Sequence, residues 1–125
     1  MKEIVSTSNA PSAIGPYSQA IKTAGLVFTS GQLPIDPVSG EIAVGDIEGQ
    51  TRCALMNLKA VLEASASSLE NVIKTTVFLA DINDFNAMNG VYKSFFESEC
   101  PARSAFQVAA LPRGAQVEIE AVAAF

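Results

Sequence analysis

Arg103 is the residue of this chain best suited to bind a carboxylate. It lies in Pro101–Gln107, where the side chains alternate as they do on a β-strand, so that successive residues point to opposite faces. We expect Ser104, Phe106 and Val108 to face the helices, and Arg103 to point to the other face of the sheet. A planar guanidinium binds a carboxylate through two parallel hydrogen bonds. Its partner is therefore either a substrate or a glutamate of the protein.

Glu118 and Glu120 form a second candidate group. The segment Val117–Ala121 alternates in the same way, so both glutamates share one strand face. Two like charges at this spacing raise at least one carboxyl pKa when water solvates them poorly. A carboxyl group with a pKa near neutrality can act as a general acid or base. The alternative is a solvated strand face with two ordinary glutamates.

Tyr17, Ser30 and Gly31 flank a predicted hairpin. Tyr17 follows Gly-Pro, and Ser30 directly precedes Gly31. A Ser-Gly pair at a strand end offers a hydroxyl and a backbone N–H to an oxygen atom. Ordinary turn chemistry without a ligand is the alternative. Two further residues are assigned structural roles only: Cys53 as a small hydrophobic residue of a helix, and Arg113 as a solvated turn residue.

The residues that are missing exclude several kinds of site. The chain has no histidine, which excludes Ser-His-Asp and Cys-His catalysis and histidine-ligated metals. Cys53 and Cys100 are far apart and form no CxxC motif, so no metal site is predicted. Neither GxGxxG nor GxxxxGK[ST] occurs, so no nucleotide phosphate cradle is predicted.

Charge and hydropathy limit the kinds of binding partner that the chain can have. The net charge is −5 with no basic cluster, which argues against a nucleic-acid surface. There is no apolar run of about 20 residues to form a membrane helix. Met1–Ala20 shows no signal or transit pattern and both thiols are expected to be free, so we expect a cytoplasmic protein. The charged share of 17% is low, which predicts that part of the surface is buried against other subunits.

Two helices are predicted around one central strand. Apolar residues recur every three or four positions over Ile47–Val61 behind the N-cap Asp46, which predicts a helix of about 18 residues. Val72–Leu79 is β-branched and apolar and predicts a central strand. Asn83 or Asp84 is expected to cap a second helix. Its apolar stripe, assigned mainly to the core, is Phe85, Met88, Tyr92, Phe95 and Phe96.

The remaining patterns complete one domain over residues 1–125. Further strands are predicted at Lys2–Val5, Tyr17–Thr23, Leu26–Ser30, Ser104–Val108 and Val117–Ala123. Together these elements predict an α+β fold in which two helices pack on one face of a mixed sheet. Because two helices cannot cover both faces, the other face should lie against another subunit.

Several segments of the chain resemble the Rid family of reactive intermediate deaminases, also labelled YjgF or endoribonuclease L-PSP. They are Ala13–Ala20, Thr29–Pro34, Val72–Leu79, Asp81–Phe85, Pro101–Ser104 and Val117–Ala121. Their number and order make the resemblance specific over nearly the whole chain. The arginine of the RidA subgroup is present as Arg103.

The resemblance implies a chorismate-mutase-like protomer and a homotrimer whose three sheets form a central β-barrel, with sites in the clefts between subunits. The implied reaction is hydrolytic deamination of reactive enamines and imines, such as 2-aminoacrylate and 2-iminobutyrate, to 2-oxo acids and ammonia. No cofactor is implied. The chain is thus expected to be a 2-iminobutanoate/2-iminopropanoate deaminase acting on a small molecule.

The resemblance also assigns roles to particular residues. Arg103 is implied to hold the substrate carboxylate and Glu118 to orient water and transfer a proton. The implied binding residues are Tyr17, Ser30, Gly31 with its backbone N–H, Phe85, Asn89 and Ala105. Many bacterial members carry Cys where this chain has Ala105, so a thiol there is not required in this protein.

Other functions remain open at the level of sequence. One is a non-catalytic trimer that binds 2-oxo acids or similar carboxylates through Arg103 and has a sensing or regulatory role. Another is an endoribonuclease acting on single-stranded RNA, which the acidic composition disfavours. A chaperone or structural role is the third.

Overall fold

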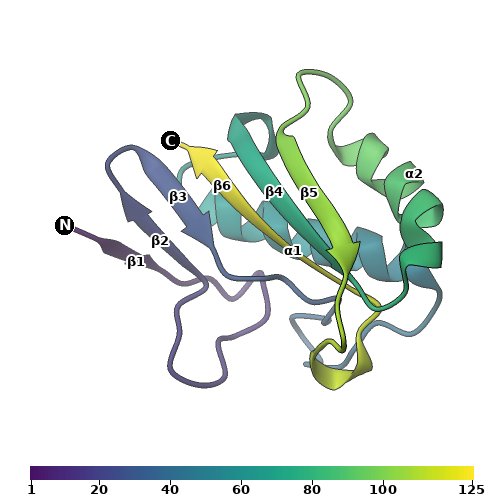
Figure 1. Cartoon of the computed structure of the whole chain (residues 1–125). Coiled ribbons are helices and arrows are strands. Elements are labelled where there is room, and N and C mark those ends of the chain that lie inside the picture. The colour runs from purple at the N-terminus through teal and green to yellow at the C-terminus, as the bar shows by residue number, and fades with distance from the viewer.

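The computed structural model describes all residues from 1 to 125 and contains one six-stranded mixed sheet with the order β1-β2-β3-β6-β4-β5 (Figure 1). Only β4 and β5 run parallel; the other neighbours are antiparallel. The strands are β1 Glu3–Val5, β2 Ala20–Thr23, β3 Leu26–Thr29, β4 Val72–Leu79, β5 Ala102–Gln107 and β6 Val117–Ala124. The helices are α1 Ile47–Ala64 and α2 Phe85–Phe95, with short 3-10 turns η1 Leu69–Asn71, η2 Ile82–Asp84 and η3 Pro112–Gly114.

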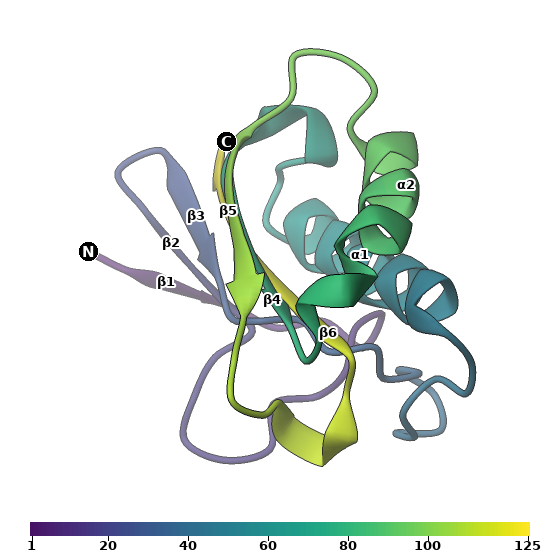
Figure 2. The same cartoon turned by 45° about the vertical axis from the view of Figure 1, so that its right-hand side comes forward.

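Both helices pack on the same face of the sheet (Figure 2). The predicted first helix is confirmed: Asp46 caps α1 by accepting a hydrogen bond from Gly49 N–H at 3.0 Å. The inner stripe of α1 is buried and consists of Ala54, Leu55, Leu58, Val61 and Leu62. Neither helix has the length and apolarity that a membrane span requires. The core therefore lies between the helices and one sheet face.

The opposite sheet face carries exposed apolar side chains, as the sequence predicted. Ile4, Phe28 and Phe106 remain 64%, 43% and 45% exposed on this face, which we call the open face. The alternation of β6 places Glu118 and Glu120 there too, and turns Val117, Ile119 and Ala121 toward the helices. The predicted facing of the two glutamates is confirmed.

The predicted facing of Arg103 is wrong. In β5, Arg103 pairs with buried Thr75 of β4 and points toward α2, whereas Phe106 pairs with Phe78 on the open face. The Phe78 and Phe106 rings meet edge to face with centroids 5.5 Å apart. Because β5 is an edge strand, most of its side chains lie outside the core. The apolar alternation therefore does not identify its inner face.

Some predicted boundaries also shift. The second strand begins at Ala20 rather than Tyr17, and α2 ends at Phe95, so that Phe96 becomes its C-cap. Asp84 precedes α2 without capping it through its side chain; the carboxylate that binds a nearby N–H is Asp81, which accepts from Asn83 at 2.9 Å. The residues from Tyr17 to Gln19 therefore belong to the loop before β2 and not to the strand.

Buried amide side chains hold the long loops. Gln19 accepts from Thr7 N–H at 2.7 Å and donates to the carbonyls of Thr7 and Pro11. Asn57 of α1 donates to the carbonyls of Leu33 at 3.0 Å and Ile35 at 2.8 Å. Of these loop carbonyls, only that of Leu33 also has a backbone donor, the Ile35 N–H at 2.8 Å. A buried carbonyl without a partner is costly.

We expect Asn57→Ala to lower the free energy of unfolding by about 1–3 kcal/mol, because it leaves the Ile35 carbonyl unpaired, removes one of the two donors to the Leu33 carbonyl and opens a small cavity. Urea or thermal unfolding measures this. The matched control is Asn86→Ala, because Asn86 is exposed on α2 and makes no side-chain hydrogen bond. Equal destabilisation by the two substitutions would contradict the role of Asn57.

Candidate active site

One cavity of about 510 Å³ brings together four of the predicted site residues. Tyr17, Ser30, Gly31 and Glu118 all line it. They come from the loop before β2, the end of β3 and the start of β6. These four residues thus lie around one cavity of a single protomer.

A bulge between β3 and β6 shapes this cavity. Phe28 pairs with Val122, and the next bridge joins Gln32 to Ile119 through hydrogen bonds of 2.8 and 3.1 Å. Thr29–Gly31 therefore faces only Glu120 and Ala121, which leaves one extra residue on this side. Consequently the Gly31 N–H donates to no acceptor of the chain.

Gly31 also allows the carboxylate of Glu118 to approach the backbone. A Cβ atom at residue 31 would overlap Glu118 Oε2 and would lie 2.7 Å from Cδ. Only glycine fits this position without displacing the carboxylate. The backbone and the carboxylate thus form one polar wall of the cavity.

Ser30 and Tyr17 contribute differently to this wall. Ser30 Oγ donates to the Ser18 carbonyl at 2.6 Å, and the Ser30 N–H donates to the Gln19 carbonyl at 2.9 Å. The Ser30 hydroxyl proton is therefore engaged in a hydrogen bond, and the hydroxyl oxygen can still accept one. Tyr17 is 52% exposed at the cavity, with its phenol free of protein partners.

The electrostatic expectation for the two glutamates is confirmed for Glu118. Its pKa lies above the ordinary glutamate value because burial disfavours the charged carboxylate, and the charge of Glu120 adds to the shift. Glu118 is half-buried. A carboxyl group shifted in this direction is better suited to accept and return protons near neutral pH.

A second group of predicted residues surrounds Arg103. Its Nη1 donates to Asn89 Oδ1 at 2.6 Å, and its guanidinium carbon lies 4.7 Å from the Tyr92 ring centroid and 5.4 Å from that of Phe85. The Tyr92 hydroxyl bonds Thr75 Oγ1 at 2.8 Å, which fixes the ring. Ala105 lies on the same face of β5, where it pairs with Val77. The guanidinium is thus held in a defined orientation.

The two groups lie on opposite faces of the sheet. Strand β4 separates β5 from β6; Arg103 pairs with Thr75 on the helix side, and Glu118 pairs with Phe78 on the open side. One protomer does not bring Arg103 and Glu118 together in a single cavity.

Sequence reasoning assigned Tyr92 to the core and Arg113 to solvent. Tyr92 is indeed buried but also stacks on Arg103, and Arg113 is indeed an exposed turn residue but also lines the Glu118 cavity. The spacing Phe85, Asn89, Tyr92 could have revealed the first contact, because residues four and three apart share one helix face. No local signal marks the second.

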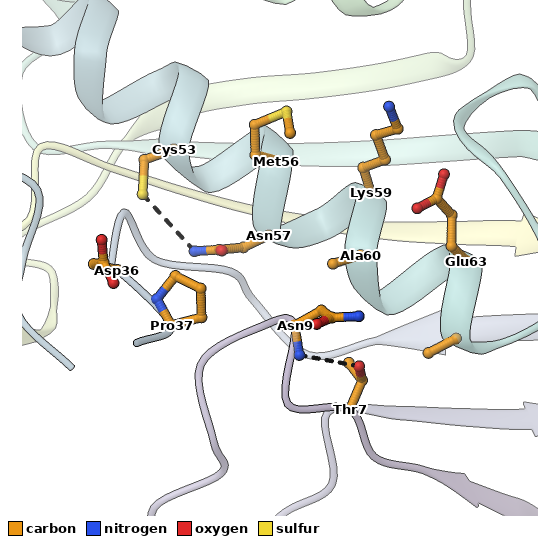
Figure 3. Close-up of a pocket in the computed structure, with 11 residues that line it drawn as sticks. Thr7, Asn9, Asp36, Pro37, Cys53, Met56, Asn57, Lys59, Ala60 and Glu63 are labelled. Carbon is orange, nitrogen blue, oxygen red and sulfur yellow. Dashed lines mark hydrogen bonds between the residues drawn. The ribbon is translucent and has the colours of Figure 1, made fainter. Parts of the chain in front are cut away.

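The largest groove, of about 750 Å³, is a weaker candidate (Figure 3). Cys53 and Asn57 face Asp36 and Pro37 across it, while Lys59 and Glu63 extend away. Burial raises the pKa of the Cys53 thiol, and Asp36 adds to this, so the thiol is a poor nucleophile. No three potential metal ligands cluster anywhere in the chain.

Comparison with known proteins places the chain in a family. The family model described as Endoribonuclease L-PSP matches residues 7–125. A conserved Rid family protein from Yersinia pestis superimposes with a TM-score of 0.98 at 46% identity, covering 100% of both chains. The chain belongs to the Rid family.

Two further Rid relatives carry functional information. The Homo sapiens protein named 2-iminobutanoate/2-iminopropanoate deaminase is 50% identical over 98% of this chain and 90% of its own length. E. coli TdcF, solved with bound serine, has a TM-score of 0.94 and 46% identity, covering 98% of each chain. The α+β fold and family expected from sequence are confirmed.

We expect Glu118→Gln to stabilise the protein at pH 7. The folded state raises the pKa of Glu118, so its unfolding free energy falls as pH rises from the unfolded pKa through the folded one. The variant should thus exceed wild type in melting temperature at pH 7, and the difference should vanish below about pH 4.

The control is Glu63→Gln, because Glu63 is an exposed residue of α1 whose side chain makes no hydrogen bond. Thermal melts of both variants between pH 3.5 and 8 measure the effect. A melting difference for Glu118→Gln that is independent of pH would contradict the assignment.

Proposed function

We propose that this protein hydrolyses reactive enamine and imine intermediates, such as 2-aminoacrylate and 2-iminobutyrate, to 2-oxo acids and ammonia. The observation that carries the proposal is Arg103. Asn89, Phe85 and Tyr92 hold its guanidinium, yet no carboxylate of the chain pairs with it; the single ion pair joins Lys22 to Glu3 at 3.9 Å. A fixed guanidinium with unused donors is suited to a substrate carboxylate. Relatives named as imine deaminases support the same reading.

The chemistry needs few groups. Protonation of the enamine carbon gives the imine, and water then adds to the C=N carbon to form a carbinolamine, which releases ammonia as its C–N bond breaks. Arg103 would bind the substrate carboxylate and withdraw electron density from the adjacent carbon. Glu118 would take a proton from the attacking water and return it to the departing nitrogen. The Gly31 N–H and Tyr17 would complete the polar wall.

The proposal assigns the complete site to two copies of the chain. Arg103 and Glu118 lie on opposite sheet faces, so a site that uses both takes Arg103 from one copy and Glu118 from the next. The exposed apolar residues of the open face support association, and we propose the homotrimer with a central barrel that the family resemblance implies. Cys53 and Cys100 are free thiols, which fits a cytoplasmic location.

A non-catalytic carboxylate-binding role is the second candidate. The observation in its favour is the serine bound to E. coli TdcF, because serine is a stable amino acid with a carboxylate and no imine. RNA cleavage has less support, because the chain has a net charge of −5 and no basic track for phosphates.

We expect the purified protein to accelerate 2-oxobutyrate formation when it is coupled to a threonine dehydratase. Arg103→Ala should reduce this acceleration by at least about 100-fold, because the carboxylate anchor is lost. The matched control Arg52→Ala removes an exposed arginine of α1 and should behave as wild type. Light scattering confirms that the compared species share one oligomeric state. Ligand binding without acceleration by wild type would favour the non-catalytic role.

A mixing experiment tests whether the site is shared. Arg103→Ala and Glu118→Gln copies, each expected to retain little activity alone, are unfolded together and refolded at equal amounts. If each site takes Arg103 from one copy and Glu118 from the next, about one quarter of the sites in the mixed oligomers carry both residues. This is because each of the two adjacent copies has to be the variant that keeps the required residue. Recovery near this level supports the shared site. Mixed oligomers without recovered activity would show that sites are not built in this way.

A further inference from the structure

Arg113 occupies the junction of two cavities. It lies in η3, where its backbone takes the left-handed conformation with φ 60° and ψ 23°. It lines the cavity of Glu118 and also a neighbouring cavity of about 240 Å³ bounded by Ile35–Gly40. Pro11, Ser12 and Ile14 line both cavities as well. The two spaces are therefore adjacent, and Arg113 lies where they meet.

One hydrogen bond fixes the guanidinium there. Arg113 Nη1 donates to the Gly40 carbonyl at 2.8 Å, across 73 residues of sequence. Its other N–H groups have no acceptor in the chain, and no carboxylate pairs with it. Among the residues that line the Glu118 cavity, Arg113 is the only one with a cationic side chain. It thus presents to that space a positive charge without an ion-pair partner, although Glu118 lines the same cavity and Asp36 lines the neighbouring one.

An anionic substrate meets repulsion at this cavity. The chain carries a net charge of −5, and the cavity contains the Glu118 carboxyl, with Glu120 two residues along the same face. At physiological ionic strength, charges are felt over a Debye length of about 8 Å, so groups at the cavity itself dominate. A single cation in the cavity wall offsets the local repulsion most effectively.

We propose that Arg113 admits anionic substrates to the Glu118 cavity by attracting their carboxylate electrostatically before Arg103 of the neighbouring copy binds it. This inference rests on the proposed function, and it makes Arg113 a positioning residue that selects substrates by charge. It acts on capture and not on bond breaking. Its loss therefore lowers kcat/KM and leaves kcat unchanged.

The test compares wild type with Arg113→Gln and Arg113→Lys at about 20 mM and about 300 mM salt. Competition with semicarbazide for 2-iminobutyrate at low imine flux gives kcat/KM, and saturating flux gives kcat. We expect Arg113→Gln to lower kcat/KM about tenfold at low salt and about threefold or less at high salt, with kcat unchanged. Arg113→Lys, which keeps the charge, should retain most of the wild-type value.

The matched control is Arg52→Gln. It changes the net charge by the same amount, but Arg52 lies exposed on α1 and lines neither cavity. It should match wild type at both salt concentrations. Parallel loss of kcat and kcat/KM in Arg113→Gln, a loss that salt does not change, or equal loss in Arg113→Lys would each overturn the proposal.

Binding separates this inference from the proposed reaction. Calorimetric titration with 2-oxobutyrate at the two salt concentrations needs no turnover. Weaker, salt-dependent binding by Arg113→Gln would support charge-based admission even if wild type failed to hydrolyse the imine, in which case only the proposed function fails. Binding that is unchanged by Arg113→Gln at low salt would overturn the role of Arg113 whatever the hydrolytic activity.

Discussion

The Gln32–Ile119 bridge decides where the candidate site forms. Its two hydrogen bonds attach the chain beyond β3 to the start of β6, one residue out of the register set by Phe28 and Val122. The extra residue frees the Gly31 N–H from the ladder and brings the backbone against the Glu118 carboxylate. Without this bridge, Glu118 would be a glutamate on a solvated strand face. The polar cavity wall follows from this local attachment, and burial together with the charge of Glu120 raises the pKa of Glu118 there.

The sheet separates Arg103 from Glu118. A strand directs neighbouring side chains to opposite faces, and Arg103 on β5 and Glu118 on β6 point to different ones. Packing with α2 gives Arg103 its orientation, since Asn89 and Tyr92 lie one helical turn apart beside it. The same packing removes Arg103 from the cavity of its own protomer. The sheet face that carries Glu118, opposite to Arg103, also exposes apolar side chains.

Loops, and not regular elements, form most of the cavity, and buried amides make them rigid. Gln19 holds the segment before β2, and Asn57 holds the segment after β3. An amide side chain can replace a missing strand partner because it carries both donors and an acceptor. Arg113 adds a further attachment at Gly40. The cavity walls are thereby fixed to the same core that holds the helices and β6.

The sequence alone determined the helices, the central strand, the uncovered sheet face and the location of Glu118 and Glu120 on one strand face. The reason is that hydrophobic periodicity reports burial directly where one face of an element packs on a core. The family motifs located Arg103 and the residues around it. The face of Arg103 was decided only in the tertiary structure, because most side chains of the edge strand β5 lie outside the core and its apolar alternation does not mark the inner face. The junction position of Arg113 and its bond to Gly40 were equally hidden, since they join residues 73 positions apart. Contacts of that range depend on how loops pack and leave no periodic trace in the chain.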